Sequence, residues 1–192
     1  MTKNILLLFF FTLAMFFSIN INSQELIPLQ VNNSWKYIEK VKIKGKLIKT
    51  DTLISRVEKT MDFNNKKWFY MTELNSKYIV RNDEKGQYEI DTLRTQNNGD
   101  FKEVLMFRND NKLNQNPYKV YETIKVKIDD KITLIKTEIG QFECIKYTII
   151  PHEALENEFY EFYFKPGIGL IYHKWVENDK ITTSELIQYN IE

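Results

Sequence analysis

The densest group of side chains that could bind a metal ion lies in residues 152–158. This segment holds His152 and three glutamates, so it supplies one imidazole and three carboxylates. Zinc sites commonly pair histidines about three to five residues apart, or they use paired cysteines. The other histidine, His173, is distant in sequence, and the chain has a single cysteine. A metal site would have to assemble in three dimensions. We therefore predict no metal and no cofactor, and we interpret residues 152–158 as an acidic loop.

The single cysteine, Cys144, is the next candidate, as a nucleophile or a redox centre. A reactive thiolate needs a base beside it, and neither histidine lies near Cys144 in the sequence. The surrounding segment, 140–147, alternates apolar and polar residues in the manner of a strand. We expect a buried and inert thiol. Without a second cysteine, no internal disulfide stabilises the fold.

Sequence motifs of the common enzyme classes do not occur in the chain. It has no Gly-x-Ser-x-Gly elbow, no Walker phosphate loop and no dinucleotide-binding Gly-x-Gly-x-x-Gly. We therefore predict that the protein is not an enzyme. The alternative that stays open is a hydrolase whose site is assembled in the fold from His152 or His173 and nearby carboxylates.

Five of the six residues from 159 to 164 are aromatic. Alternate side chains of a strand share a face, so Tyr160, Phe162 and Phe164 lie on one face and Tyr163 lies on the other. A central strand with a packed core on one side explains this pattern. The functional interpretation is that one face lines a cavity for a lipid or forms a flat platform for a sugar. The candidate ligand-binding residues are Tyr160, Phe162, Phe164 and Tyr163.

The composition indicates which elements position these residues. The chain of 192 residues has 27 basic and 26 acidic side chains, and 14% of its residues are aromatic, but it has only two alanines. Scarce alanine disfavours a helix bundle, whereas abundant β-branched and aromatic residues favour strands. The balanced, interspersed charge excludes the basic field that is typical of nucleic-acid-binding proteins. This length predicts one domain with a substantial core.

Residues 1–23 have the pattern of a secretory signal peptide. Lys3 provides the positive start, and an apolar stretch over 5–17 follows that is short for a membrane span. The alternative is an uncleaved membrane helix. Cleavage before Gln24 removes Lys3 and leaves 26 basic and 26 acidic groups, so the mature chain is neutral. We expect export to the periplasm or out of the cell, with no stable membrane span after cleavage.

Alternating runs separated by turn residues recur through the mature chain. In the first run, over 35–43, apolar residues alternate with lysines, and the last run ends near Tyr189. Residues 97–100 (Asn-Asn-Gly-Asp) predict a tight turn, and residues 108–117 predict a polar loop. The expected fold is a single all-β domain over 24–192. It is a strongly curved antiparallel sheet of about ten strands, a closed or half-open barrel, with at most a short helical turn after Pro151.

Several short motifs resemble a group of uncharacterised exported β-proteins of Gram-negative bacteria. They are Leu-x-Pro-Leu (26–29), Asn-x-Trp-x-Tyr (33–37), Gly-x-Phe-x-Cys (140–144), Pro-Gly-Ile-Gly-Leu-Ile (166–171) and Glu-Leu-Ile-x-Tyr (185–189). The group is similar to curved-sheet envelope proteins related to lipoprotein carriers, so the resemblance implies an open or closed antiparallel barrel in the cell envelope. No catalytic residues are assigned in that group, and the resemblance implies none here.

Three functions are compatible with these observations. The first is a non-enzymatic envelope protein that binds an apolar or amphipathic ligand within the curved sheet. The second is a module that stacks exposed rings, such as Trp68, Trp175 or Tyr163, on a polysaccharide or on another envelope protein. The third is the hydrolase described above. The first is favoured because it joins export, a barrel-like fold and the aromatic strand.

Overall fold

The structure is a computed structural model that describes residues 25–90, 102–109, 117–121, 124–151 and 158–192. All regular structure in these residues is β-sheet. Among them, no helix is long and apolar enough to cross a membrane. The expected signal peptide, the turn at 97–100 and the helical turn after Pro151 lie outside the described residues, as do His152 and its neighbouring glutamates up to residue 157.

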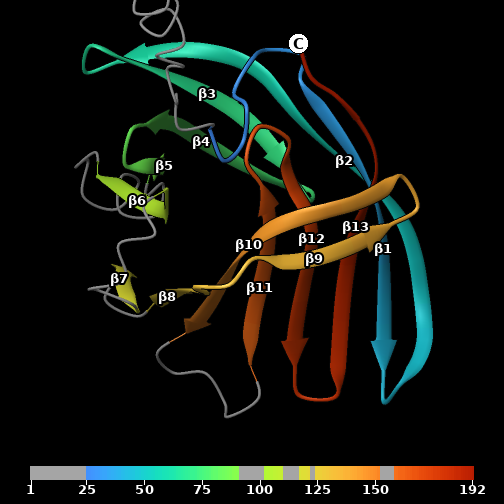
Figure 1. The fold of residues 1–192 in the computed structure, drawn as a ribbon. Coiled ribbons are helices and arrows are strands. Elements are labelled where there is room, and N and C mark those ends of the chain that lie inside the picture. Colours follow the sequence, from blue (N-terminus) through green and yellow to red (C-terminus); the bar gives the residue numbers. More distant parts are fainter. Residues whose placement is uncertain (1–24, 91–101, 110–116, 122–123, 152–157) are drawn as a thin grey trace, which may run out of the picture.

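Within the described residues, thirteen strands form one antiparallel sheet that curves into an almost closed barrel (Figure 1). The expected all-β, strongly curved architecture is confirmed, with more strands than the ten or so that were expected. One additional strand is β7, which follows the segment 108–117 that was expected to be a polar loop; most of that segment, 110–116, lies outside the described residues. The strands are β1 (Ser34–Ile43), β2 (Lys46–Phe63), β3 (Lys66–Glu73), β4 (Ser76–Asp83), β5 (Gly86–Ile90), β6 (Glu103–Arg108), β7 (Tyr118–Tyr121), β8 (Ile124–Ile128), β9 (Thr133–Thr137), β10 (Gly140–Pro151), β11 (Phe159–Lys165), β12 (Gly169–Glu177) and β13 (Lys180–Asn190).

The order of strands in the sheet is β6-β5-β4-β3-β2-β1-β13-β12-β11-β10-β8-β7, and β9 pairs with β10 beside this path. Sequential strands are mostly neighbours, as in a meander. The exception in the middle of the sheet is the antiparallel pair of β1 and β13. The first and last strands of the chain therefore meet at the centre, and this pair joins the two halves of the barrel.

The long strand β2 pairs with different neighbours along its two parts. Its first part pairs with β1 as far as Arg56, and its second part pairs with β3 from Arg56 to Phe63. Leu53, Ser55 and Val57 alternate inward and are buried, whereas residues 46–50 are exposed on both faces. The inner face of the sheet is therefore open to solvent along the start of β2.

Buried side chains gather where β1 begins, and this end of β1 lies toward the top of Figure 1. The Trp35 indole is 1% exposed and donates a hydrogen bond from Nε1 to the Ile168 carbonyl over 2.6 Å. Gly169 has a φ of 110°, and a Cβ there would lie 3.3 Å from Trp35 Nε1. The Gly167 N–H donates to the Glu25 carbonyl over 2.8 Å. The Pro-Gly-Ile-Gly turn thus packs on Trp35 and holds the segment that precedes β1.

Strands β6 and β7 are the two ends of the strand order, and they meet at a seam. The described residues form no backbone ladder across this seam. Side chains bridge it instead. The Tyr118 hydroxyl donates to the Met106 carbonyl over 2.9 Å and accepts from the Arg108 N–H over 3.4 Å. The Tyr147 hydroxyl donates to the Arg108 carbonyl over 2.6 Å. The Arg108 guanidinium also lies 4.2 Å from the centre of the Tyr118 ring.

The hairpin of β9 and β10 leaves the barrel wall and reaches β13 across the outside (Figure 1). At its tip, the Glu138 N–H donates to Glu185 Oε1 over 3.3 Å. Cys144 lies in this part of β10 and is fully buried. Burial raises the pKa of its thiol to about 12, so the thiolate does not form near neutral pH. The prediction of a buried cysteine is confirmed.

Tyr118→Phe tests the side-chain closure of the seam. The substitution removes the hydroxyl that bonds to Met106 and Arg108, and we expect a loss of about 1–2 kcal/mol in the free energy of unfolding. Urea unfolding measures the change. Tyr189→Phe is the matched control, because Tyr189 is 42% exposed. Equal stabilities of the two variants would contradict this role of Tyr118.

Candidate ligand-binding face

Two rows of cross-strand neighbours run across the inside of the sheet from β8 to β2. The first row is Ile128, Tyr147, Phe162, His173, Ser184, Glu39 and Asp51. The second row is Val126, Ile149, Tyr160, Trp175, Thr182, Val41 and Lys49. We call these fourteen residues the concave face. Along the first row, apolar and aromatic side chains give way to neutral polar groups and then to acidic ones; the second row runs from apolar and aromatic residues through Thr182 and Val41 to Lys49.

Ring contacts across the barrel show that these rows face inward. Phe107 of β6 lies 5.1 Å from the Tyr147 ring and 5.5 Å from the Phe162 ring, centre to centre. Several strands separate β6 from β11 along the sheet, so the contact passes through the interior. On the same face, Tyr160 stacks on Trp175 with ring centres 5.6 Å apart and planes 11° apart.

The structure brings together three of the four predicted ligand-binding residues. Tyr160, Phe162 and Phe164 share the inner face, as strand alternation predicts, and Phe162 stacks on Phe164. Phe164 is fully buried and belongs to the core, whereas Tyr160 and Phe162 keep accessible surface. Tyr163 lies on the opposite face, where it packs against Tyr172 and donates to Glu161 Oε2 over 3.1 Å. Only Tyr160 and Phe162 of the four can present their rings to a ligand inside the barrel.

Three polar atoms of the concave face are buried without a hydrogen-bond partner among the described residues. They are Nδ1 of His173, Nε1 of Trp175 and Oγ of Ser184. His173 and Ser184 are direct cross-strand neighbours, and Trp175 lies two residues further along β12. His173 is 9% exposed and Ser184 is 1% exposed. Unpaired buried polar groups are rare and cost about 1–3 kcal/mol each, so this cluster is arranged for hydrogen bonds that the described chain does not supply.

The imidazole of His173 is neutral at physiological pH. Desolvation lowers its pKa from 6.5 to about 4. Its ring lies 4.6 Å from the Phe162 ring, and no ion pair joins it to a carboxylate among the described residues. The hydrolase alternative needs a carboxylate beside a histidine. His173 lacks such a partner in the described structure, and His152 lies outside it; this part of the chain also holds no group of three or more potential metal ligands.

The far end of both rows is charged and more exposed. Glu39 and Asp51 are cross-strand neighbours on β1 and β2, and Lys49 forms an ion pair with Asp51. The pKa of Lys49 is raised, chiefly by its hydrogen bond and its charge interaction with Asp51, and also by Glu39. At the other edge, Lys180 lies 4.4 Å above the Trp175 ring and 3.5 Å from Glu177 Oε2. Each lysine here is therefore accompanied by a carboxylate.

A second acidic group lies deeper in the barrel. Burial, and then the charge of Glu89, raise the pKa of Glu73 from 4.5 to about 7. Glu73 nevertheless keeps part of its surface accessible. Glu73 also contributes to the raised pKa values of Tyr37 and Tyr78, after burial in both cases. The interior is thus polar as well as aromatic at this level.

Several residues of this face were not singled out by motif analysis. Ser184, Glu39 and Glu73 carry no recognisable motif in the sequence. The sequence does contain one detectable signal, which is a polar residue at a position where strand alternation points inward. Thr182 and Ser184 lie four and two residues before the buried Leu186, and Glu73 lies two residues after the buried Met71. His173 was considered only for hydrolysis and Trp175 only for an exposed platform.

The rings proposed for stacking on polysaccharide do not form an exposed row. Trp68 is 0% exposed and Tyr163 is 9% exposed. Trp175 is partly buried and belongs to the concave face. These three rings therefore lie in different environments and do not form one stacking surface.

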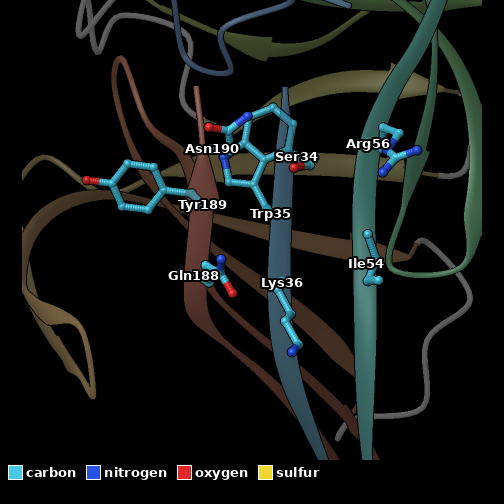
Figure 2. A pocket seen from close by; sticks show the side chains of 8 residues that line it. All are labelled: Ser34, Trp35, Lys36, Ile54, Arg56, Gln188, Tyr189 and Asn190. Carbon is cyan, nitrogen blue, oxygen red and sulfur yellow. The ribbon is translucent and has the colours of Figure 1, made fainter. Parts of the chain in front are cut away.

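A shallow pocket of about 170 Å³ lies on β1, β2 and β13 (Figure 2). Lys36, Ile54 and Arg56 line it and alternate with the buried Tyr37 and Leu53, so it opens on the outer face. Its volume is below the 300 Å³ or so at which small-molecule sites usually begin. The remaining lining residues are Ser34, Trp35, Gln188, Tyr189 and Asn190.

His173→Phe tests the burial of a neutral imidazole on the concave face. The folded-state pKa is about 4 and the ordinary value is 6.5, so the wild type loses stability as the pH falls from 6.5 to 4, because protons bind the unfolded state first. The variant lacks this loss. We expect its stability relative to wild type to rise by up to about 3 kcal/mol over this range, as measured by urea unfolding at several pH values. A difference that stays constant from pH 8 to pH 4 would contradict the burial of His173.

The fold has counterparts among solved structures. No family model and no curated protein match the chain. A proposed exported protein with a YmcC-like fold from Bacteroides fragilis NCTC 9343 is 13% identical, with a TM-score of 0.52 over 88% of this chain and 100% of that chain. A proposed lipoprotein from Parabacteroides distasonis ATCC 8503 is also 13% identical, with a TM-score of 0.48 over 87% of this chain and 99% of that one. The first likeness shows a shared fold and agrees with the resemblance to exported β-proteins; neither description states a ligand or a reaction.

Proposed function

We propose that the protein is an exported, non-enzymatic protein that binds an amphipathic ligand on its concave face. The observation that carries this proposal is the cluster of three unpartnered buried polar atoms beside accessible aromatic rings. A ligand with an apolar body and a hydrogen-bonding group satisfies both features at once. Binding sites of this kind are mostly apolar with a few polar groups that set the orientation.

The aromatic half of the face supplies the driving force for binding. Tyr160, Phe162 and Trp175 are partly accessible although their rings point into the barrel. Covering them with an acyl chain or another apolar group removes apolar surface from water, which contributes about 25 cal/mol per Å². The neighbouring Val126 and Ile149 are already buried and form the floor beside them.

The polar cluster then selects where the ligand's polar group lies. A ligand oxygen could accept from Trp175 Nε1 and exchange hydrogen bonds with Ser184 Oγ and His173 Nδ1. In the unliganded protein these atoms are buried without partners among the described residues. Supplying partners removes a penalty that the folded chain otherwise carries. The same ligand therefore gains from both halves of the face.

Export is supported by the sequence and by the fold. Residues 1–23 have the charge and apolar pattern of a signal peptide. The fold neighbours in Bacteroides fragilis and Parabacteroides distasonis are themselves described as a proposed exported protein and a proposed lipoprotein. A ligand-binding protein of the envelope is consistent with both.

Binding of N-phenyl-1-naphthylamine, an uncharged fluorescent probe with an apolar ring system and one N–H group, tests the proposal. We expect its fluorescence to rise on binding to the purified protein, and we expect Trp175→Ala and Tyr160→Ala each to weaken binding about tenfold. Circular dichroism confirms that each variant is folded.

The control is Tyr189→Ala, which removes a 42% exposed ring near the end of β13, outside the two rows of the concave face. It should bind the probe like the wild type. The proposal is wrong if the wild type does not bind the probe, or if Tyr189→Ala weakens binding as much as the two concave-face variants. Should Trp175→Ala fail to fold, Trp175→Phe keeps an aromatic ring at this position and removes the Nε1–H together with part of the indole.

A further inference from the structure

We infer that the ligand carries an uncharged, hydroxyl-rich head group, as an acylglycerol or a glycolipid does, and that the concave face discriminates against anionic lipids such as free fatty acids. This inference rests on the proposed function and names the class of ligand for the same site. It follows from the kind of polar group found at each position along the two rows.

The polar groups that follow the aromatic half are neutral. Ser184 and Thr182 offer hydroxyls, Trp175 offers an indole N–H, and His173 is an uncharged imidazole. Hydroxyls and a neutral imidazole both donate and accept hydrogen bonds. They therefore match alcohol groups, which also do both, better than a carboxylate, which only accepts.

The next positions along the first row are acidic, whereas the second row continues with Val41 and Lys49. Glu39 is the cross-strand neighbour of Ser184, and Asp51 is the neighbour of Glu39. Carboxylates accept hydrogen bonds from hydroxyls and repel another anion. A head group that extends from β12 toward β2 thus meets acceptors that suit a glycerol or a sugar and oppose a fatty acid.

The lysines of this region do not offset that repulsion. Lys49 is ion-paired with Asp51, and Lys180 lies within 3.5 Å of Glu177. Counting these groups with Glu39 gives three carboxylates against two ammonium groups. The concave face therefore has a small excess of negative charge where the head group would lie.

Competition between lipids with the same acyl chain tests the inference. At pH 8, where laurate is ionised, 1-lauroylglycerol, laurate and dodecyltrimethylammonium each compete with N-phenyl-1-naphthylamine below their micelle-forming concentrations. We expect 1-lauroylglycerol to displace the probe at a concentration about tenfold lower than laurate, which the carboxylates repel, and than dodecyltrimethylammonium, whose head group makes no hydrogen bond to the neutral polar groups. Equal or better displacement by laurate or by dodecyltrimethylammonium overturns the inference, as does the failure of 1-lauroylglycerol to displace a bound probe. If the probe itself does not bind, the proposed function fails instead.

Variants that neutralise the carboxylates distinguish electrostatic repulsion of laurate from a difference in how the two lipids pack. Glu39→Gln with Asp51→Asn removes two carboxylates without changing the size of the side chains. We expect this double variant to improve displacement by laurate about tenfold while that by 1-lauroylglycerol changes by less than about twofold. Glu143→Gln, on the exposed side of β10, is the control and should change neither value. An unchanged preference in the double variant overturns the role of the acidic groups.

Discussion

The inner surface depends on the antiparallel register of the strands from β10 to β2, because this register decides which side chains point into the barrel. Side chains alternate with a period of two, so a slip of one residue would exchange the inner and outer faces of a strand. Bulges interrupt the ladders only at the ends of this region, between Lys36 and Tyr37, Val41 and Lys42, and Tyr163 and Phe164. Between the bulges the pairing is regular, and this regularity aligns Phe162, His173, Ser184, Glu39 and Asp51 in one row.

Different contacts close the barrel at the start of β1 and at the seam, and the start of β2 is left open. At the end where β1 begins, the turn at Gly169 packs on Trp35 and the preceding segment is buried with it. At the seam, β6 and β7 are joined by the side chains of Tyr118 and Tyr147 rather than by a ladder. The start of β2, by contrast, is exposed on both faces. The barrel is thus filled at one end and open beside β1 and β2, where the charged end of the concave face reaches solvent.

Local patterns in the sequence predict much of this fold, because alternation and turn residues act over a few positions. They predict an all-β domain, the division of residues 159–164 between two faces and the burial of Cys144. Non-local pairing is not contained in such patterns. The alignment of His173 with Ser184 and Glu39 requires that β13 pair with β12 and β1 at once. Strand alternation thus predicts that Tyr160 and Phe162 share the inner face, but the polar side chains beside them could not be derived before the strand order was known.

The chain has three tryptophans, and their indole N–H groups report directly on whether the concave face holds a ligand. In ¹H–¹⁵N NMR spectra, titration with 1-lauroylglycerol should shift the indole resonance of Trp175, whose Nε1 is buried without a partner in the described structure. The resonance of Trp35, which donates to Ile168, should move far less. A Trp175 resonance that stays in place at saturating 1-lauroylglycerol, or a larger shift at Trp35, would contradict a ligand site on the concave face.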